Sequence, residues 1–437
     1  MRNDAAGVTK LLAAGADPYQ TFTKRTPLQA AAYYGKTDGV RALLAYPVPP
    51  ENTDREKANR IEAMNHAALG GKIASAALLL EHKVDYTHPT AIKHALNRRH
   101  YAMVEWLLDV DPACPIAIDP VHPPLPLLKR LIAGGAQVLT CYAGDHLGNC
   151  SDDLERLQFL YNLDRAFFHR PIDPRDCSTR VPAHRPIDTA LRVAAGKGAL
   201  EGVKFLLQEG AQVDHPANAM RAAAEGGEAI ISPAYVYKAK EHQAVLQLLA
   251  QQATSNDIFV QVALGQTNAF TKAIAADPTL LQAQTEPHFG KSILHVAIEH
   301  KRTDSLRALL ALGADPNLPD SYCDVRPLHL AAIRLETETV QLLLDHGAKP
   351  NVLTTGMVPT SPIHALIEIA LTHAKEPPLQ NKATAIAKLL LAHGASLDQP
   401  TPRIWRPHNG RPSVSEWIRD AGPEWMKAWL PPSKDPR

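Results

Sequence analysis

Apolar residues recur along this chain in triplets at positions i, i+3 and i+4, which places three side chains on one face of an α-helix. Polar residues fill the intervening positions, so each triplet predicts an amphipathic helix with one buried face. Successive triplets start about two to four dozen residues apart, centred near ~33, the length of a repeat built from two helices and a turn. A weaker twelfth triplet, Leu157/Leu160/Tyr161, splits the only large gap between the eleven clear ones. The clear ones are Val8/Leu11/Leu12, Val40/Leu43/Leu44, Ala76/Leu79/Leu80, Val104/Leu107/Leu108, Leu128/Leu131/Ile132, Val203/Leu206/Leu207, Val245/Leu248/Leu249, Phe270/Ala273/Ile274, Leu306/Leu309/Leu310, Val340/Leu343/Leu344 and Ile386/Leu389/Leu390.

Start and stop signals divide each repeat into two helices. A Thr or Ser precedes a short Ala-rich helix in Thr26-Pro27-Leu28-Gln29-Ala30-Ala31-Ala32 and Ser292-Ile293-Leu294-His295-Val296-Ala297. Such a residue caps the helix, and Pro at the first helical turn costs no hydrogen bond. A Gly free to adopt positive φ closes the second helix in the better copies, at Gly15, Gly210, Gly313, Gly347 and Gly394.

The pattern of Thr-Pro-Leu-His-x-Ala-Ala, a longer helix and a Gly-Ala-Asp turn resembles the ankyrin repeat family. It is strong at 24–45, 189–214 and 287–351, moderate at 59–118, 216–286 and 360–398, and poor from about 119 to 186. The resemblance implies an all-α solenoid of stacked helix-turn-helix units with β-turn or hairpin tips. We expect an array of about 11 to 12 units over residues 1–400, divergent at 119–186, and a degenerate terminal repeat that caps the stack at 401–437.

Both ends of the chain depart from a full repeat. Residues 8–18 read as the second half of a unit. A misassigned or shortened start, a partner that covers this end, and a tolerated frayed end all remain open. Near the other end, Trp425 and Trp429 are expected to share a helical face after Pro423. Large aromatics there either shield the last repeat or anchor a partner.

Charge and composition narrow the function. With 46 Lys and Arg against 45 Asp and Glu, the net charge is +1, so no global field attracts nucleic acid or an anionic membrane. The basic run Lys93, His94, Arg98, Arg99 and His100 reads as a solvated helix face, without the interleaved aromatics that single-strand binding requires. No run approaches the ~20 apolar residues of a membrane span, and the first residues do not resemble a signal peptide. We expect a cytoplasmic monomer; a protein exported into a host cell would look the same.

The sequence gives little support for a metal site or for catalysis. Five Cys fit a reducing compartment. Cys141, His146 and Cys150 are spaced by five and four residues, and Cys177 has no close partner, whereas structural zinc uses ligand pairs two to four residues apart. We therefore expect no metal and no cofactor. Glycine-rich nucleotide loops, Gly-x-Ser-x-Gly and His-Glu-x-x-His are absent, so we expect no catalytic residues.

The expected function is a protein-protein interaction scaffold or adaptor. The alternatives are an exported bacterial-type effector that acts on a host protein and, less favoured, a metal-stabilised adaptor or an enzyme. By resemblance, residues just after the Ala-Ala of each first helix face a concave groove and contact the partner; paired Tyr offers large area at low entropic cost. These candidates are Tyr33, Tyr34, Asn97, Arg98, Lys197, Glu299, His300, Ile333 and Arg334.

Three inserts exceed the repeat length, and insertions in solenoids project from one face. They span about 164–186, 228–241 and 372–384. The second is the most apolar loop, and Ile231, Tyr235 and Tyr237 are its candidate partner-binding residues, unless it folds back onto the array. The third reads as a polar extended loop.

Overall fold

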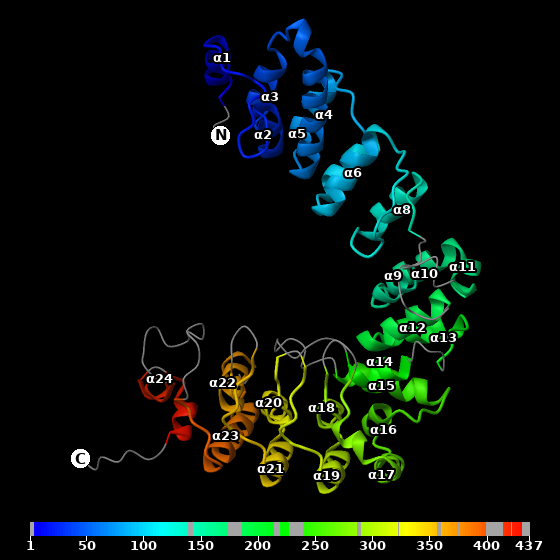
Figure 1. Ribbon diagram of the computed structural model, residues 1–437, viewed down its shortest axis with the longest axis vertical. Helices are drawn as coiled ribbons and strands as arrows, with labels where there is room; N and C mark the ends of the chain where they lie inside the picture. The colour runs from blue at the N-terminus through cyan, green and yellow to red at the C-terminus, as the bar shows by residue number, and fades with distance from the viewer. Residues whose placement is uncertain are drawn as a thin grey trace. The chain divides into compact units, whose positions relative to one another are not determined.

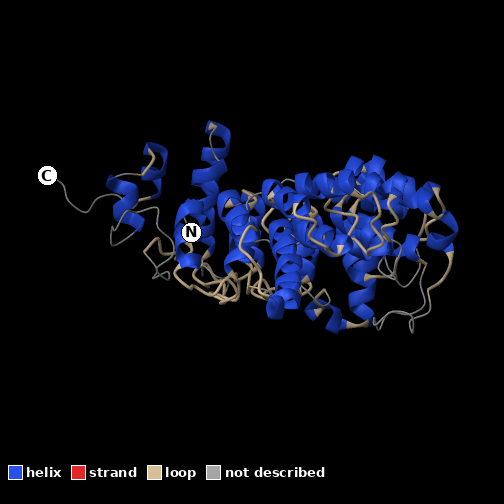
Figure 2. Cartoon of the chain, turned by 90° about the horizontal axis from the view of Figure 1, so that it is seen from above, coloured by secondary structure: helices blue, strands red, loops and turns tan. Residues whose placement is uncertain are grey.

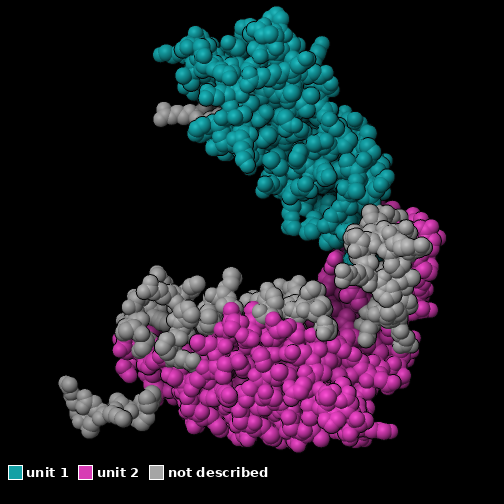
Figure 3. All heavy atoms as spheres, in the orientation of Figure 1, with its two compact units in different colours: residues 1–146 teal, residues 147–437 magenta. Residues whose placement is uncertain are grey.

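The computed structural model describes residues 4–138, 143–172, 185–213, 219–226, 239–285, 290–321, 323–355, 360–373, 376–398, 414–420 and 422–430. In these ranges the chain forms helices and loops (Figure 2), with isolated β-bridges in place of strands. Two compact units divide the chain, residues 1–146 and 147–437 (Figure 3). The boundary falls inside helix α9 (Ala143–Asn149).

Unit 1 contains two rows of helices (Figure 1). First helices α2, α4 and α6 pack side by side, and each contacts the second helix that follows it. The first helices are α2 (Pro27–Tyr34), α4 (Thr53–Leu69) and α6 (His88–Asn97). The other helices are α1 (Ala5–Ala13), α3 (Thr37–Leu44), α5 (Ile73–Glu81), α7 (Tyr101–Val110) and α8 (Leu125–Ala133), with a short 3-10 helix, η1 (Pro50–Asn52), before α4.

Unit 2 repeats the arrangement, and its neighbouring first helices also pack against one another. These are α12 (Pro186–Lys197), α14 (Ala219–Glu225), α16 (Ile258–Leu264), α18 (Ile293–Glu299), α20 (Pro327–Ile333) and α22 (Pro362–His373). The other row contains α10 (Leu154–Leu163), α13 (Leu200–Gln208), α15 (Ala239–Ala250), α17 (Thr267–Ala276), α19 (Thr303–Ala311), α21 (Thr337–Asp345) and α23 (Pro377–Ala392). Shorter elements are α11 (Arg165–His169), η4 (Pro278–Gln282), α24 (Val414–Asp420) and η5 (Glu424–Trp429).

The triplets confirm the prediction of amphipathic second helices, because each of the twelve lies on a helix of that row. Val40, Leu79 and Leu309 are fully buried between neighbouring helices. Leu11 is an exception and is 64% exposed. The core is therefore a continuous layer of Leu and Val between repeats, as the periodicity predicts.

Capping chemistry sets where the first helices begin. The Thr26 hydroxyl accepts a hydrogen bond from the backbone N–H of Gln29, whose side-chain oxygen accepts from the Thr26 N–H at 3.1 Å. This reciprocal box satisfies two N–H groups that have no helical partner. Just before it, Phe22 and Arg25 form an antiparallel bridge, with Thr23 and Lys24 both at positive φ. That geometry is a tight hairpin tip.

The divergent segments have local structure of their own, and one sequence prediction needs correction. The segment 111–124 before α8 contains no first helix; its backbone instead pairs with Gln137, as in the Ile118 N–H to Gln137 carbonyl bond at 3.0 Å. The insert at 164–186 is partly helical, and Phe168 of α11 is buried. The insert at 372–384 is mostly not an extended loop, because α22 runs to His373 and α23 begins at Pro377. Pro is tolerated at that first turn, so Pro377-Pro378 starts a helix there.

The aromatic residues near the end pack differently from a shared helical face. Trp425 and Trp429 lie on the 3-10 helix η5, edge to face with ring centroids 5.8 Å apart. Trp429 is 2% exposed, and its indole N–H donates to the Thr384 hydroxyl of α23 at 3.1 Å. Trp429 therefore covers α23, which favours the shielding role over the partner anchor.

Residues with positive φ allow the energetic cost of backbone strain to be measured. In several repeats the residue before the N-cap of the second helix adopts positive φ; it is Gly at Gly35, Gly198 and Gly265 but Lys301 (φ 53°) in another repeat. We expect Lys301→Gly to stabilise the chain by about 0.5–1 kcal/mol, because left-handed backbone is strained for any residue with a Cβ. Urea unfolding monitored by circular dichroism measures it. Gly313→Ala (φ 92°), where a Cβ would meet no atom within 4 Å, should destabilise by about 1 kcal/mol.

Candidate interaction surface

The C-terminal ends of the first helices, with the turns into the second helices, form an edge along each unit, here called the helix-end edge. In unit 1 it comprises residues 33–36, 66–72 and 97–100. In unit 2 it comprises 196–199, 224–226, 263–266, 299–302 and 333–336. Every partner-binding candidate outside the inserts falls on this edge.

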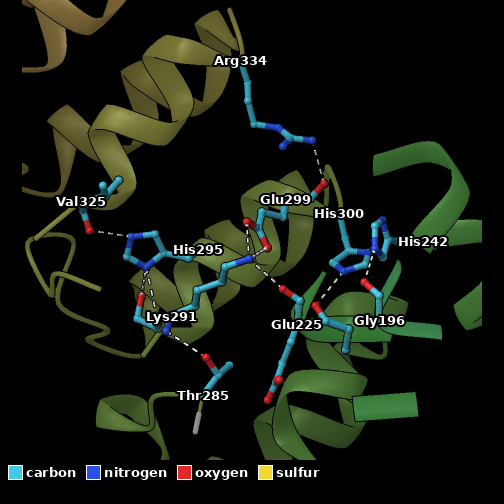
Figure 4. Close-up of polar contacts among 12 residues, drawn as sticks. Gly196, Glu225, His242, Thr285, Lys291, His295, Glu299, His300, Val325 and Arg334 are labelled. Carbon is cyan, nitrogen blue, oxygen red and sulfur yellow. Dashed lines mark hydrogen bonds and ion pairs between the residues drawn. The ribbon is translucent and has the colours of Figure 1, made fainter. Parts of the chain in front are cut away.

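In unit 2, side chains at the helix-end edge hydrogen-bond to carbonyls at the ends of helices in earlier repeats. The last carbonyls of a helix have no internal partner, and cationic or imidazole N–H groups satisfy them while complementing the helix dipole. Figure 4 shows three of these bonds. The set comprises Lys197 Nζ to Asn149 O (2.7 Å), His242 Nε2 to Gly196 O (2.8 Å), His300 Nε2 to Ala224 O (2.9 Å), Arg302 Nε to Ala263 O (2.8 Å) and Arg334 Nη2 to Glu299 O (2.9 Å).

A buried ion pair lies at the centre of this arrangement (Figure 4). Lys291 Nζ is 2.8 Å from Glu299 Oε1 and donates to the Glu225 backbone carbonyl at 2.7 Å. The side chains of Lys291 and Glu299 are only 3% and 12% exposed. The pair joins α18 to α14, because Lys291 bonds Glu225, a residue 66 positions earlier in the sequence. Losing either charge would leave the other desolvated without a partner, which is costly.

The pKa values follow from burial and these charges. Burial raises the pKa of Glu299, but the charges of Lys291 and then Arg334 outweigh it and hold the pKa below its ordinary value. Burial lowers the pKa of His300 to about 4. His300 is therefore neutral at pH 7, with Nε2–H donating to the Ala224 carbonyl.

A second set of histidines ties the repeats together at the other end of the first helices. His295, His329 and His364 are buried, and each Nε2 donates at 3.0 Å to the backbone of the following repeat, at Val325, Thr360 and Leu397. Nδ1 accepts from the cap residue, as in the Arg326 N–H to His329 bond at 3.2 Å. These contacts give the three histidines a structural role.

The edge of unit 1 presents side chains to solvent. Tyr34 is 55% exposed and Tyr33 is half-buried, and their rings meet edge to face with centroids 5.0 Å apart. The Arg25 guanidinium lies 4.2 Å from the Tyr33 ring centroid, a cation–π contact. Farther along the edge, Asn97 and Arg98 are exposed.

The spacing Arg25 to Tyr33 matches Lys291 to Glu299, since each cation lies just before the helix cap and its partner eight residues later. In unit 2 the partner is a carboxylate, and in unit 1 it is an aromatic ring. Lys291 was not among the residues singled out from the sequence. A Lys before the cap with a Glu eight residues on was the available signal.

Several predicted partner-binding residues make contacts within the chain. His300 is buried against Ala224, so its assignment to an exposed groove is wrong. Glu299 and Arg334 are also mostly enclosed, with Arg334 Nε 3.5 Å from Glu336 Oε1. Lys197 is half-buried and pairs with Asp152 at 2.7 Å. Ile333 is half-buried and stays a candidate.

Other residues singled out from the sequence lie outside the described ranges, or show no metal ligation within them. Ile231, Tyr235 and Tyr237 lie outside the described ranges, as do Cys141 and Cys177. Cys150 is buried. Within the described ranges, no three His, Cys, Asp or Glu residues gather as metal ligands do. Nor is any helix in those ranges both long and apolar enough to cross a bilayer.

Comparison with known proteins extends these observations. The most similar curated proteins include the regulatory protein NPR5 of Arabidopsis thaliana, 45% identical over 64 residues, which are 14% of this chain and 13% of that protein. Human transient receptor potential cation channel subfamily A member 1 is 33% identical over 82 residues, 19% of this chain and 7% of the channel. The chain thus spans a small fraction of these relatives' lengths.

A solved structure and a family model also match. The crystal structure of the human ASB11 ankyrin repeat domain is 19% identical, covering 57% of this chain and 98% of that one, with a TM-score of 0.26. The model described as ankyrin repeats in three copies matches residues 1–116 and 220–354. Those segments are more than half of the 437 residues. This chain belongs to the ankyrin repeat family.

Proposed function

We propose that the chain is an adaptor whose protein partner contacts the helix-end edge of unit 1. Ankyrin repeats are protein-interaction modules, and the relatives include a BTB/POZ domain and ankyrin repeat-containing protein of Lupinus angustifolius. The observation that carries the proposal is the exposure of Tyr34 beside Tyr33. Rigid aromatic side chains of this kind supply much of the binding energy at protein interfaces.

The contrast between the units supports this assignment. Lys197, Glu299, His300 and Arg334 are engaged in bonds between repeats, so a partner could use them only by breaking those bonds. Tyr34, Asn97 and Arg98 need no such change. A partner therefore gains more free energy on the unit 1 edge. Ile231, Tyr235 and Tyr237 remain a second proposed contact.

Site-specific photo-crosslinking tests the proposal. With p-benzoylphenylalanine at position 34 or at position 98, irradiation in the source cells is expected to capture the same protein. The matched control at Lys272, which is exposed on the second helix α17, should not capture it. Unrelated products at 34 and 98, or the same product at 272, would contradict the assignment.

The tyrosines provide a prediction on affinity. Tyr33→Ser with Tyr34→Ser should weaken binding of the captured protein about tenfold or more, because two aromatic contacts at an interface centre are worth more than 1 kcal/mol. Stability should fall by less than about 1.5 kcal/mol, since Tyr34 is exposed and Tyr33 only half-buried. Calorimetry and urea unfolding measure the two effects; unchanged affinity would oppose the proposal.

A further inference from the structure

The helix-end edge of unit 1 carries cations without carboxylate partners. These are Lys36, Lys72, Arg98 and Arg99 on the edge and Arg25, whose guanidinium reaches the edge at Tyr33; none of them makes an ion pair within the described part of the unit. Neighbouring carboxylates are already engaged, since Asp38 pairs with Arg41 at 3.8 Å and Glu56 with Arg60. An exposed carboxylate on α4, Glu62, accepts from the Asn65 amide at 3.3 Å.

These cations lie on one continuous surface. The Lys72 side chain covers Gly35, with its Cδ 3.0 Å from where a Cβ of that glycine would be. The His100 ring covers Gly71 in the same way, at 2.7 Å. Each turn therefore touches the turn of the preceding repeat, and α2, α4 and α6 pack in that order. The basic positions of three successive repeats are adjacent.

Apolar groups lie at one end of this surface. Phe22 is 83% exposed at the hairpin tip, directly beside Arg25 through the Phe22–Arg25 bridge. Arg25 in turn covers Tyr33, and Tyr34 is exposed next to it. Large exposed aromatics beside unpaired cations are typical of a protein-binding surface.

We propose that this surface binds an extended acidic segment of a partner protein, with its apolar side chain placed against Phe22, Tyr33 and Tyr34. This inference rests on the proposed function and adds the chemistry of the ligand. Five unit charges outweigh the Glu62 carboxylate together with the opposing dipoles of the three helix ends, which are worth about −0.5 each. The net local field is therefore positive and steers an acidic partner toward the edge.

The repeat spacing gives the acidic segment a register. Packed helices lie about 8–10 Å apart, and a chain in the extended polyproline II conformation advances about 3.1 Å per residue with three residues per turn, so every third side chain points the same way. Three extended residues therefore span one repeat. Glu or Asp at every third position would meet the cations of successive repeats, whereas clustered carboxylates would meet those of one repeat only.

Nucleic acid fits the surface less well. Base stacking needs open aromatic faces in series. Here Tyr33 and Tyr34 pack edge to face against each other, and Arg25 covers Tyr33. Aromatic groups are confined to one end, while Arg98 and Arg99 lie two repeats away.

Fluorescence anisotropy on the full chain tests the proposal with defined probes. The first is a labelled 15-residue Gly/Ser peptide with one terminal Leu and Glu at every third position. A second peptide has the same Glu residues clustered together, and a third has Lys in place of each Glu. The fourth probe is an oligo(rU) 15-mer. We expect the spaced Glu peptide to bind at least threefold more tightly than the clustered one, and the Lys peptide not to bind. Tighter binding of oligo(rU), or equal binding of the Lys peptide, would overturn the inference.

Charge reversal locates the site. K72E/R98E/R99E should weaken the spaced Glu peptide at least thirtyfold, because attraction becomes repulsion at three positions. The matched control K272E/K382E/K388E makes the same charge change at exposed positions on α17 and α23 and should leave the affinity within twofold. Equal effects of the two triples would show a non-specific field and reject the site.

Arg99 separates binding from folding, because it holds positive φ (57°) where other repeats use Gly. R99G should raise the urea midpoint of unfolding and weaken binding of the spaced Glu peptide severalfold. A higher midpoint together with tighter peptide binding would count against the proposal.

If the acidic peptide fails to bind while the crosslinks at 34 and 98 still capture one protein, the ligand class is wrong and the proposed function stands. If the crosslinks fail and the peptide binds, the proposed function fails instead.

Discussion

Replacing Lys291 with Met is expected to destabilise the chain by about 3–5 kcal/mol, the largest single effect that the structure predicts. The substitution leaves the Glu299 carboxylate buried without its cation, and the Glu225 carbonyl without its donor. Breaking a buried pair from one side costs this much because the remaining charge is desolvated and unpaired. Urea unfolding at pH 7.5, followed by circular dichroism, measures the change.

Two variants separate the ion pair from general damage. K291M/E299L should recover most of the loss, since replacing both partners with apolar groups of similar size is often nearly neutral. Lys204→Met removes an exposed partner of Glu201 (2.7 Å) and should cost less than about 1 kcal/mol. A loss of unfolding free energy for K291M no larger than that for Lys204→Met would contradict the stabilising role of the buried Lys291–Glu299 pair.

Acidification is expected to cause the second large loss of folding stability. Burial lowers the pKa of His295, His300 and His329 to about 4, below the ordinary 6.5. The unfolded chain therefore binds protons that the folded chain rejects, so the stability from these groups is present above pH 6.5 and is lost as pH falls toward 4. Between pH 7.5 and pH 5 each should cost about 2 kcal/mol. Burial raises the pKa of Glu225 and Glu336, which opposes part of this loss.

An earlier repeat of the chain shows which substitution removes the titrating group and keeps the helix cap. Gln29 occupies the position of His329 in an earlier repeat and makes the same capping box without a titrating ring. His329→Gln should therefore fold, and the loss of stability between pH 7.5 and pH 5 should shrink by about 2 kcal/mol. Urea midpoints at pH 7.5, 6.5, 5.5 and 5.0 check this, and an unchanged pH profile would show that His329 does not titrate in that range.

Periodicity and capping signals predicted most of the fold because they are local. A triplet such as Val340/Leu343/Leu344 specifies a buried helix face by itself, and Thr26 or Ser292 marks a helix start without reference to distant residues. Local signals were insufficient where context decides the structure. Pro377-Pro378 is as compatible with a helix start as with a loop, and 111–124 has no first helix although α8 carries a triplet.

The candidate site was predicted less well, because position on an edge does not reveal what a side chain contacts. His300 and Tyr34 both follow the apolar part of a first helix. His300 is buried because a carbonyl 76 residues earlier, at Ala224, lies beside it. Contacts at that separation depend on which repeats become neighbours after an insert of unusual length. The sequence identified the edge, and the structure separated its exposed part from its structural part.

Hydrogen exchange tests the central claim most directly: the partner contacts the unit 1 edge, whereas the unit 2 edge joins repeats. The full chain would be exchanged with and without the protein captured from position 34, and peptides read by mass spectrometry. We predict slower exchange on binding at 33–36, 66–72 and 97–100, with no change at 299–302 and 333–336. Slowing confined to 299–302 and 333–336, with the unit 1 edge unchanged, would contradict the account.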